Sequence, residues 1–161
     1  LITASSEAVF GGVYKLAAVE KNGEIIPKIK ISENAAKITL PGVKIPWRLY
    51  DRETGKAIAD VITLNDESIS SDEPYEIFDP EHTWKRKVVT DFVAKKLQVK
   101  IFEKGRQVYF VPSVKEISKH RAEQVDSLWD EVTRFENPHT YYVDLSEKLW
   151  GLRHDLLNNL S

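Results

Sequence analysis

Two alternating apolar runs near the start of the chain flank Lys21-Asn22-Gly23 and predict a β-hairpin. The runs cover residues 13–19 and 24–31, and apolar positions recur in them with the period of two that is typical of a half-buried strand. An Asn-Gly pair tolerates positive φ, so it closes such a turn with little strain. Pro27 lies within the second run and cannot donate to a ladder, so we expect that strand to lie at an edge or to begin late.

A second pair of strands is predicted at residues 47–51 and 57–64, on either side of the turn at 53–56. Within the longer run, side chains of alternate residues point to opposite faces. This alternation places Ile58 and Ile62 on one face, and Ala59, Val61 and Thr63 on the other.

An acidic, serine-rich stretch at 65–74 is followed by short apolar runs that predict a β-rich middle. These runs lie at 75–78, 88–93, 97–102 and 108–111, with Gly105 in the turn before the last of them. For the run at 97–102 a second interpretation stays open, in which it ends a short helix that begins near Thr90.

After Pro112 the apolar period changes to that of a helix. Ser113 and Glu116 have capping-box spacing, and the stripe that follows extends to Phe135 with a break expected near His120. Asn137-Pro138 ends this region. Asp144 and Glu147 predict a second capping box, before a terminal helix marked by Leu145, Leu149, Leu152, Leu156 and Leu160.

The order of these elements, hairpins first and then two amphipathic helices, predicts an α+β fold because no βαβ alternation is present. A length of 161 residues is typical of one domain. A net charge of −2 gives no electrostatic case for binding nucleic acid, and no apolar run is long enough to cross a bilayer. The start of the chain lacks the pattern of a signal peptide.

Residue chemistry gives few candidates for catalysis. The absence of cysteine removes disulfides, thiolate zinc sites and cysteine nucleophiles, and it fits a reducing compartment. The four histidines are not at metal-ligand spacing, and no glycine-rich phosphate motif is present. Acidic residues that are neighbours in sequence point apart, whereas a general acid–base pair needs convergent carboxylates. These observations alone indicate an α+β domain without catalytic apparatus of its own.

The first hairpin carries three lysines, Lys15, Lys28 and Lys30, and the last two share one strand face. They follow Gly11-Gly12, which permits close approach of a backbone, and this arrangement suits an anionic ligand. The alternative, which is the more common one for a charged strand face, is an ordinary solvated surface.

Three segments resemble the C-terminal part of bacterial nicotinate phosphoribosyltransferases: GGVYKLAAVE with PKIKIS, RLYD with ETGKAIAD, and RFENPHTYYVDLSEKLW. The resemblance extends from Leu1 to about residue 157. Members of that family join phosphoribosyl pyrophosphate to nicotinate, giving nicotinate mononucleotide and pyrophosphate in NAD salvage. Hydrolysis of ATP through a phosphorylated histidine drives the reaction, and the fold is an α/β barrel with a β-rich flanking domain.

The resemblance implies a piece of a larger enzyme, which agrees with a chain that opens on Leu1 and contains no methionine. Residues 1–64 would supply the end of the barrel and two hairpins, 65–111 a β-rich flanking segment, and 112–161 a helical segment. The phosphohistidine and the nicotinate-binding arginines would lie upstream, so no catalytic or metal-binding residue is expected here and the isolated chain would be inactive.

The resemblance also implies a limited set of contacts for this segment. Thr3 would lie nearest the 5′-phosphate pocket, and Lys15 and Lys30 are candidates for binding phosphate or pyrophosphate. The parent enzyme would use ATP with magnesium and act as a cytoplasmic homodimer, without nucleic acid or membrane.

The alternative function is a non-catalytic interaction or structural domain. An enzyme segment should expose apolar surface that a barrel covers, whereas an independent domain should be a compact monomer.

Overall fold

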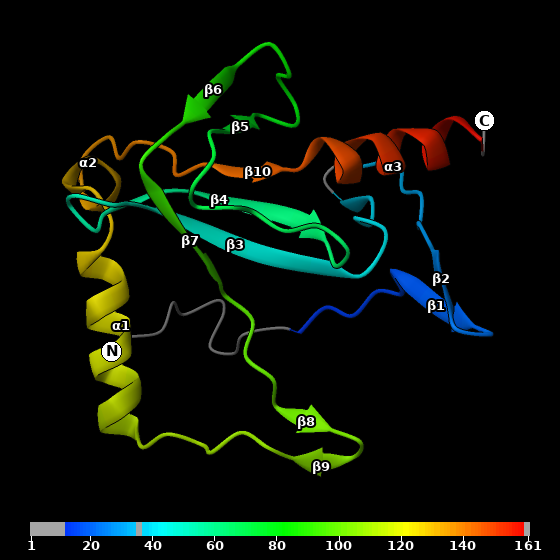
Figure 1. Ribbon diagram of the computed structural model, residues 1–161, viewed down its shortest axis with the longest axis horizontal. Helices are drawn as coiled ribbons and strands as arrows, with labels where there is room; N and C mark the ends of the chain where they lie inside the picture. The colour runs from blue at the N-terminus through cyan, green and yellow to red at the C-terminus, as the bar shows by residue number, and fades with distance from the viewer. Residues whose placement is uncertain (1–11, 35–36, 160–161) are drawn as a thin grey trace.

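A mixed four-stranded sheet forms the centre of the computed structural model, which describes residues 12–34 and 37–159 (Figure 1). Its strand order is β10-β4-β3-β7. Strand β3 (Lys44–Asp51) pairs antiparallel with both β4 (Ala57–Leu64) and β7 (Phe92–Lys96), while β10 (Val143–Leu145) joins the outer side of β4 in parallel. The α+β class predicted from the sequence is confirmed, and the parallel edge strand adds a pairing between distant segments.

Strands β3 and β4 confirm the second predicted hairpin, with the first strand beginning at Lys44, earlier than expected. Ala57, Ala59, Val61 and Thr63 are buried, and the residues between them on the opposite face, from Ile58 to Ile62, are half-buried. The two faces therefore follow the alternation in the sequence. The main core lies on the buried face and comprises Trp47, Leu49, Ala59, Val61, Ile69, Ile77, Val89 and Phe92.

The first predicted hairpin is also present, as a separate two-stranded ribbon of β1 (Ala18–Lys21) and β2 (Glu24–Pro27). Its turn has positive φ at both Asn22 (54°) and Gly23 (82°), which is the geometry that an Asn-Gly turn favours. The strands are shorter than the apolar runs, and the second ends at Pro27, although the next amide, that of Lys28, still donates to the Ala17 carbonyl oxygen (2.8 Å).

Two further ribbons lie in the middle of the chain. Strand β5 (Tyr75–Phe78) pairs with β6 (Arg86–Val89), and β8 (Phe102–Glu103) pairs with β9 (Arg106–Gln107). The run at 88–93 is divided between β6 and β7 by Asp91, whose φ is +51°. The alternative interpretation, a short helix that begins near Thr90, is wrong, because β7 pairs with β3 in this region and residues 97–101 are irregular.

Helix α1 (Val114–Asp126) begins with the predicted capping box between Ser113 and Glu116. The break expected near His120 is wrong, since the helix continues to Asp126 and the shorter α2 (Asp130–Thr133) follows. The break between α1 and α2 lies where Lys56 and Ala57, at the start of β4, form hydrogen bonds to residues at the end of α1. The amide of Ala57 donates to the Ser127 carbonyl oxygen (2.7 Å), and Lys56 Nζ donates to the carbonyl oxygens of Asp126 and Leu128.

Helix α3 (Glu147–Asn158) begins at the cap residue Ser146, so the capping box predicted from Asp144 is wrong. Asp144 belongs to β10, where it is registered with Val61, and this pairing delays the start of the helix. Ser146 Oγ accepts from the Leu149 amide (3.2 Å) and donates to Glu67 (2.8 Å). Leu149 is fully buried, Leu145 lies in the strand, and Leu160 lies outside the described residues.

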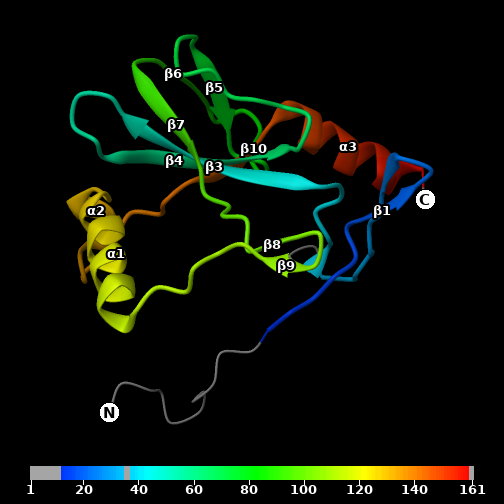
Figure 2. The same cartoon turned by 60° about the horizontal axis from the view of Figure 1, so that its bottom comes forward.

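The two long helices lie at opposite ends of the sheet (Figures 1 and 2). Helix α3 packs against β4 through Leu149, whereas α1 contains no buried residue. Large apolar side chains are exposed on α1 and on the segments before it, among them Val99, Phe102, Phe110, Val111, Val114 and Ile117. In the described part of the chain, no helix is both long and apolar enough to cross a membrane.

Candidate functional site

The two candidate phosphate-binding lysines both contact the short segment 37–39. Lys15 Nζ donates to the Lys37 carbonyl oxygen (2.6 Å), and the Lys30 carbonyl oxygen accepts from the Thr39 amide (3.3 Å). Both lysine residues are exposed, and the cavity described below is lined by other residues. Thr3 lies outside the described residues. The phosphate-binding role of all three therefore stays a prediction.

Two of the four histidines, His82 and His154, have local structural partners. His82 Nδ1 lies 3.1 Å from Asp79 Oδ2, and His154 Nδ1 lies 2.8 Å from the Trp150 carbonyl oxygen, with its ring 3.8 Å from the indole ring. Over residues 12–34 and 37–159, no three His, Cys, Asp or Glu side chains are grouped so that they could hold a metal ion.

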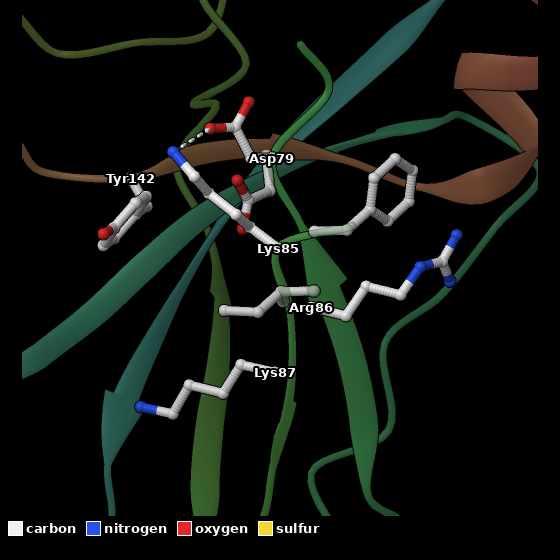
Figure 3. A pocket seen from close by; sticks show the side chains of 8 residues that line it. Asp79, Lys85, Arg86, Lys87 and Tyr142 are labelled. Atoms are coloured by element: carbon white, nitrogen blue, oxygen red, sulfur yellow. Dashed lines mark ion pairs between the residues drawn. The ribbon is translucent and has the colours of Figure 1, made fainter. Parts of the chain in front are cut away.

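A cavity of about 290 Å³ lies between the β5–β6 ribbon and the segment that leads into β10 (Figure 3). Ile77, Phe78 and Tyr142 supply apolar surface, and two carboxylates, those of Asp79 and Asp144, also line it. The remaining lining residues are the consecutive basic residues of β6 and the position before it: Lys85, Arg86 and Lys87.

Of the two carboxylates, that of Asp79 is well supplied with donors. Its oxygens accept from the amides of Glu81 (2.9 Å) and His82 (3.0 Å), and Lys85 Nζ lies 3.9 Å away. These hydrogen bonds, that of the Glu81 amide foremost, hold the pKa of Asp79 below its usual range. The Asp79 carboxylate is therefore ionised and satisfied within its own loop.

The Asp144 carboxyl has the opposite environment. Asp144 is only 3% exposed, and among the described residues no side chain or amide donates a hydrogen bond to its carboxyl or forms an ion pair with it. Burial, with a smaller effect from the charge of Asp79, raises the pKa of Asp144 to about 6. Two carboxylates that line one cavity thus differ in affinity for protons.

A second charged cluster joins α1 to the sheet. Arg48 makes a two-pronged ion pair with Asp60 (2.7 and 2.9 Å) and donates to Gln124 of α1 (3.1 Å). Tyr141 donates its hydroxyl proton to the same Asp60 (2.9 Å). Because every member has a partner, this cluster is satisfied and holds elements together.

The cavity is not evident from the sequence, because Asp144 has the spacing of a helix cap. The signal that was available is the short run Tyr141-Tyr142-Val143-Asp144-Leu145, which is rich in aromatic and β-branched residues and, if extended, places Asp144 on the same face as Tyr142. Asp79, the other carboxylate of the cavity, follows β5 directly in the sequence. Their convergence depends on the packing of β10 beside β5.

The fold defines an α+β domain. Its described residues include the carboxylates and lysines named above, and no group of side chains among them could hold a metal ion. A family model described as "Nicotinate phosphoribosyltransferase C-terminal domain" matches residues 43–153. The chain belongs to this family of C-terminal domains, as the resemblance predicted.

Relatives from several organisms support the assignment. The chain is 39% identical to a nicotinate phosphoribosyltransferase of Bacillus subtilis over 94% of its length, and 32% identical to one of Dictyostelium discoideum over 97%. It spans only 31% and 27% of those relatives. The crystal structure of human nicotinic acid phosphoribosyltransferase matches 74% of the chain and 24% of its own length, with a TM-score of 0.66 and 25% identity.

Proposed function

We propose that this chain is the C-terminal part of an enzyme that forms nicotinate mononucleotide from nicotinate and phosphoribosyl pyrophosphate, with ATP hydrolysis, in NAD salvage. The single observation that carries this proposal is the 39% identity to the Bacillus subtilis enzyme across nearly the whole chain. The match to the C-terminal domain family supports the same position within the enzyme.

The proposed role of this segment is structural, with a contribution to binding phosphate. Exposed apolar side chains on α1 and before it, such as Phe110, Val114 and Ile117, suit a surface that packs against the barrel. Reaction of the substrates would depend on the phosphohistidine and the nicotinate-binding arginines of the barrel, and the isolated chain would be inactive.

Lys15, Lys30 and Thr3 are the residues proposed to face phosphate. Lysine acts as a compact point charge and does not need bidentate geometry. The Lys15 ammonium donates one proton to the Lys37 carbonyl oxygen, which leaves two for an anion. We further propose that the parent enzyme uses ATP with magnesium, works as a homodimer and is cytoplasmic.

A chimera tests the proposal. The matching C-terminal segment of the Bacillus subtilis enzyme is replaced by this chain, and formation of nicotinate mononucleotide is measured beside the same enzyme without the segment. We expect activity in the chimera and none without the segment. A folded, soluble chimera that is inactive would contradict the proposal and favour the alternative, an interaction or structural domain.

The role of the lysines is tested in the active chimera. Lys15→Ala and Lys30→Ala should raise the Michaelis constant for phosphoribosyl pyrophosphate and leave that for nicotinate unchanged, because only the former carries phosphate groups. Lys119→Ala, on the exposed surface of α1, is the matched control. An unchanged constant for phosphoribosyl pyrophosphate in a lysine variant would remove that lysine from the site.

A further inference from the structure

We propose that the cavity between the β5–β6 ribbon and β10 binds a small organic cation, a primary ammonium or guanidinium group on a short apolar stem, through the carboxylate of Asp144. The proposal concerns a site on this domain itself, and only the comparison of ligand sources in the chimera rests on the function proposed above.

The first argument is the unsatisfied carboxylate. Asp144 is 3% exposed and lines the cavity, and no described residue donates to it or pairs with it. The fully enclosed side-chain atoms without a partner are Thr39 Oγ1 and Arg153 Nε, so the Asp144 oxygens keep some access to the cavity. Holding a carboxylate with so little access to water and no protein donor is nevertheless costly. A ligand that carries N–H donors and positive charge removes this cost directly.

The second argument is that two of the three neighbouring cations, those of Lys85 and Arg86, are already engaged. Lys85 lies beside Asp79, and Arg86 donates to both Glu76 and Glu147. In Figure 3 the Lys87 side chain extends away from Asp79 and Lys85, and the Arg86 guanidinium points to the opposite side of the cavity. The charge that remains uncompensated in the buried part of the cavity is that of Asp144.

The third argument is the size and lining of the cavity. A volume of about 290 Å³ is at the lower end of the range for ligand sites, so the occupant is small. Ile77 and Phe78 present buried apolar surface to a hydrocarbon stem, and Tyr142 adds an aromatic ring that attracts a cation.

The test uses butylammonium and butylguanidinium chlorides as probes, and butanol as a neutral control of similar size. Titration of the ¹⁵N-labelled 161-residue chain, followed by NMR, should shift the amide signals of Ile77, Tyr142 and Asp144. For ligands of this size we expect dissociation constants on the order of 1 mM for the cations. Butanol should bind at least tenfold more weakly.

Two variants make the test specific. Asp144→Asn keeps the shape of the side chain and removes its charge, so it should weaken binding of both cations at least tenfold. Asp72→Asn makes the same charge change at an exposed residue and should leave binding unchanged. Preserved amide dispersion in both variants shows that the fold is intact. Equal binding by wild type and Asp144→Asn, or no binding by wild type, would overturn the proposal.

The same cation could reach Asp144 as a free molecule or as an arginine or lysine side chain from another part of the enzyme. Repeating the titration on the chimera distinguishes these sources. Binding that persists there supports a free ligand, and binding that is lost there, but present in the isolated chain, supports a side chain that fills the cavity. Because this readout needs no catalysis, it is separate from the activity that tests the proposed function.

The affinity should also depend on pH. With the pKa of Asp144 at about 6, roughly a tenth of this carboxyl is ionised at pH 5, so binding should be roughly tenfold weaker there than at pH 7.5. The other charged groups at the cavity are Asp79, whose pKa lies below its usual range, and the basic residues Lys85, Arg86 and Lys87.

Discussion

Replacing Arg48 by methionine should destabilise the domain strongly, because it leaves a largely buried carboxylate, that of Asp60, without its main partner. The Arg48 and Asp60 side chains are 17% and 13% exposed, and the guanidinium makes two hydrogen bonds to the carboxylate. In Arg48→Met, Asp60 retains only the hydroxyl of Tyr141. Removing one partner of a buried ion pair typically costs about 3–5 kcal/mol, and the bond to Gln124 is lost as well.

The second half of this prediction is a partial recovery in the double variant. Arg48→Met with Asp60→Leu removes both charges and fills their space with apolar atoms, and such replacements are often neutral or stabilising. We therefore expect the double variant to unfold within about 1–2 kcal/mol of wild type. The destabilisation in the single variant is then due to the charge left behind, and the coupling between the two sites is large.

Urea denaturation of the 161-residue chain, followed by tryptophan fluorescence, measures these free energies of unfolding. The matched control is Lys148→Met, which breaks the exposed ion pair with Asp66. Both of those side chains are more than half exposed, so the control should cost less than about 1 kcal/mol. If Arg48→Met costs no more than the control, or if the double variant is the least stable of all, the reasoning is wrong.

Three further predictions use the same measurement. Gly42→Ala should destabilise by about 1–3 kcal/mol, because φ is +84° there and a Cβ would lie 2.7 Å from Leu64 Cδ2; an unchanged midpoint would contradict this. Ser146→Ala should cost about 1–2 kcal/mol, since it removes the cap of α3 and the donor to Glu67, and a variant as stable as wild type would disprove it. Asp144→Asn should stabilise the chain by on the order of 1–3 kcal/mol at pH 8 and have little effect at pH 4. The raised pKa means that the folded chain holds this proton more tightly than the unfolded one. The contribution of Asp144 to the stability of the wild type therefore falls as pH rises from about 4 to 6, and a benefit of Asp144→Asn that is equal at both pH values would refute the assignment.

Local patterns in the sequence determined most of the elements. The Asn22-Gly23 turn, the strand alternation from Ala57 to Leu64 and the Ser113 cap each depend on residues within a few positions, and all three are present. Hairpins and caps are set by backbone preferences and short-range hydrogen bonds, so their sequences predict them well.

The elements that were placed wrongly depend on distant partners. Asp144 has the right spacing for a helix cap, but pairing of β10 with β4 makes it a strand residue. The end of α1 is set by contacts of Lys56 and Ala57 with residues near 127, and the helix is continuous through His120. Propensity is a weak guide at such positions because tertiary contacts override it.

By itself, the sequence determined the fold class, the hairpins and the family to which this domain belongs. Only the tertiary structure decided that β10 joins the sheet in parallel and that the Asp144 carboxyl shares a cavity with Asp79, 65 positions earlier in the printed sequence. The physical reason is that alternation and capping follow from neighbours along the chain. The burial and pKa of a carboxyl depend on groups that only the packing of separate elements brings together.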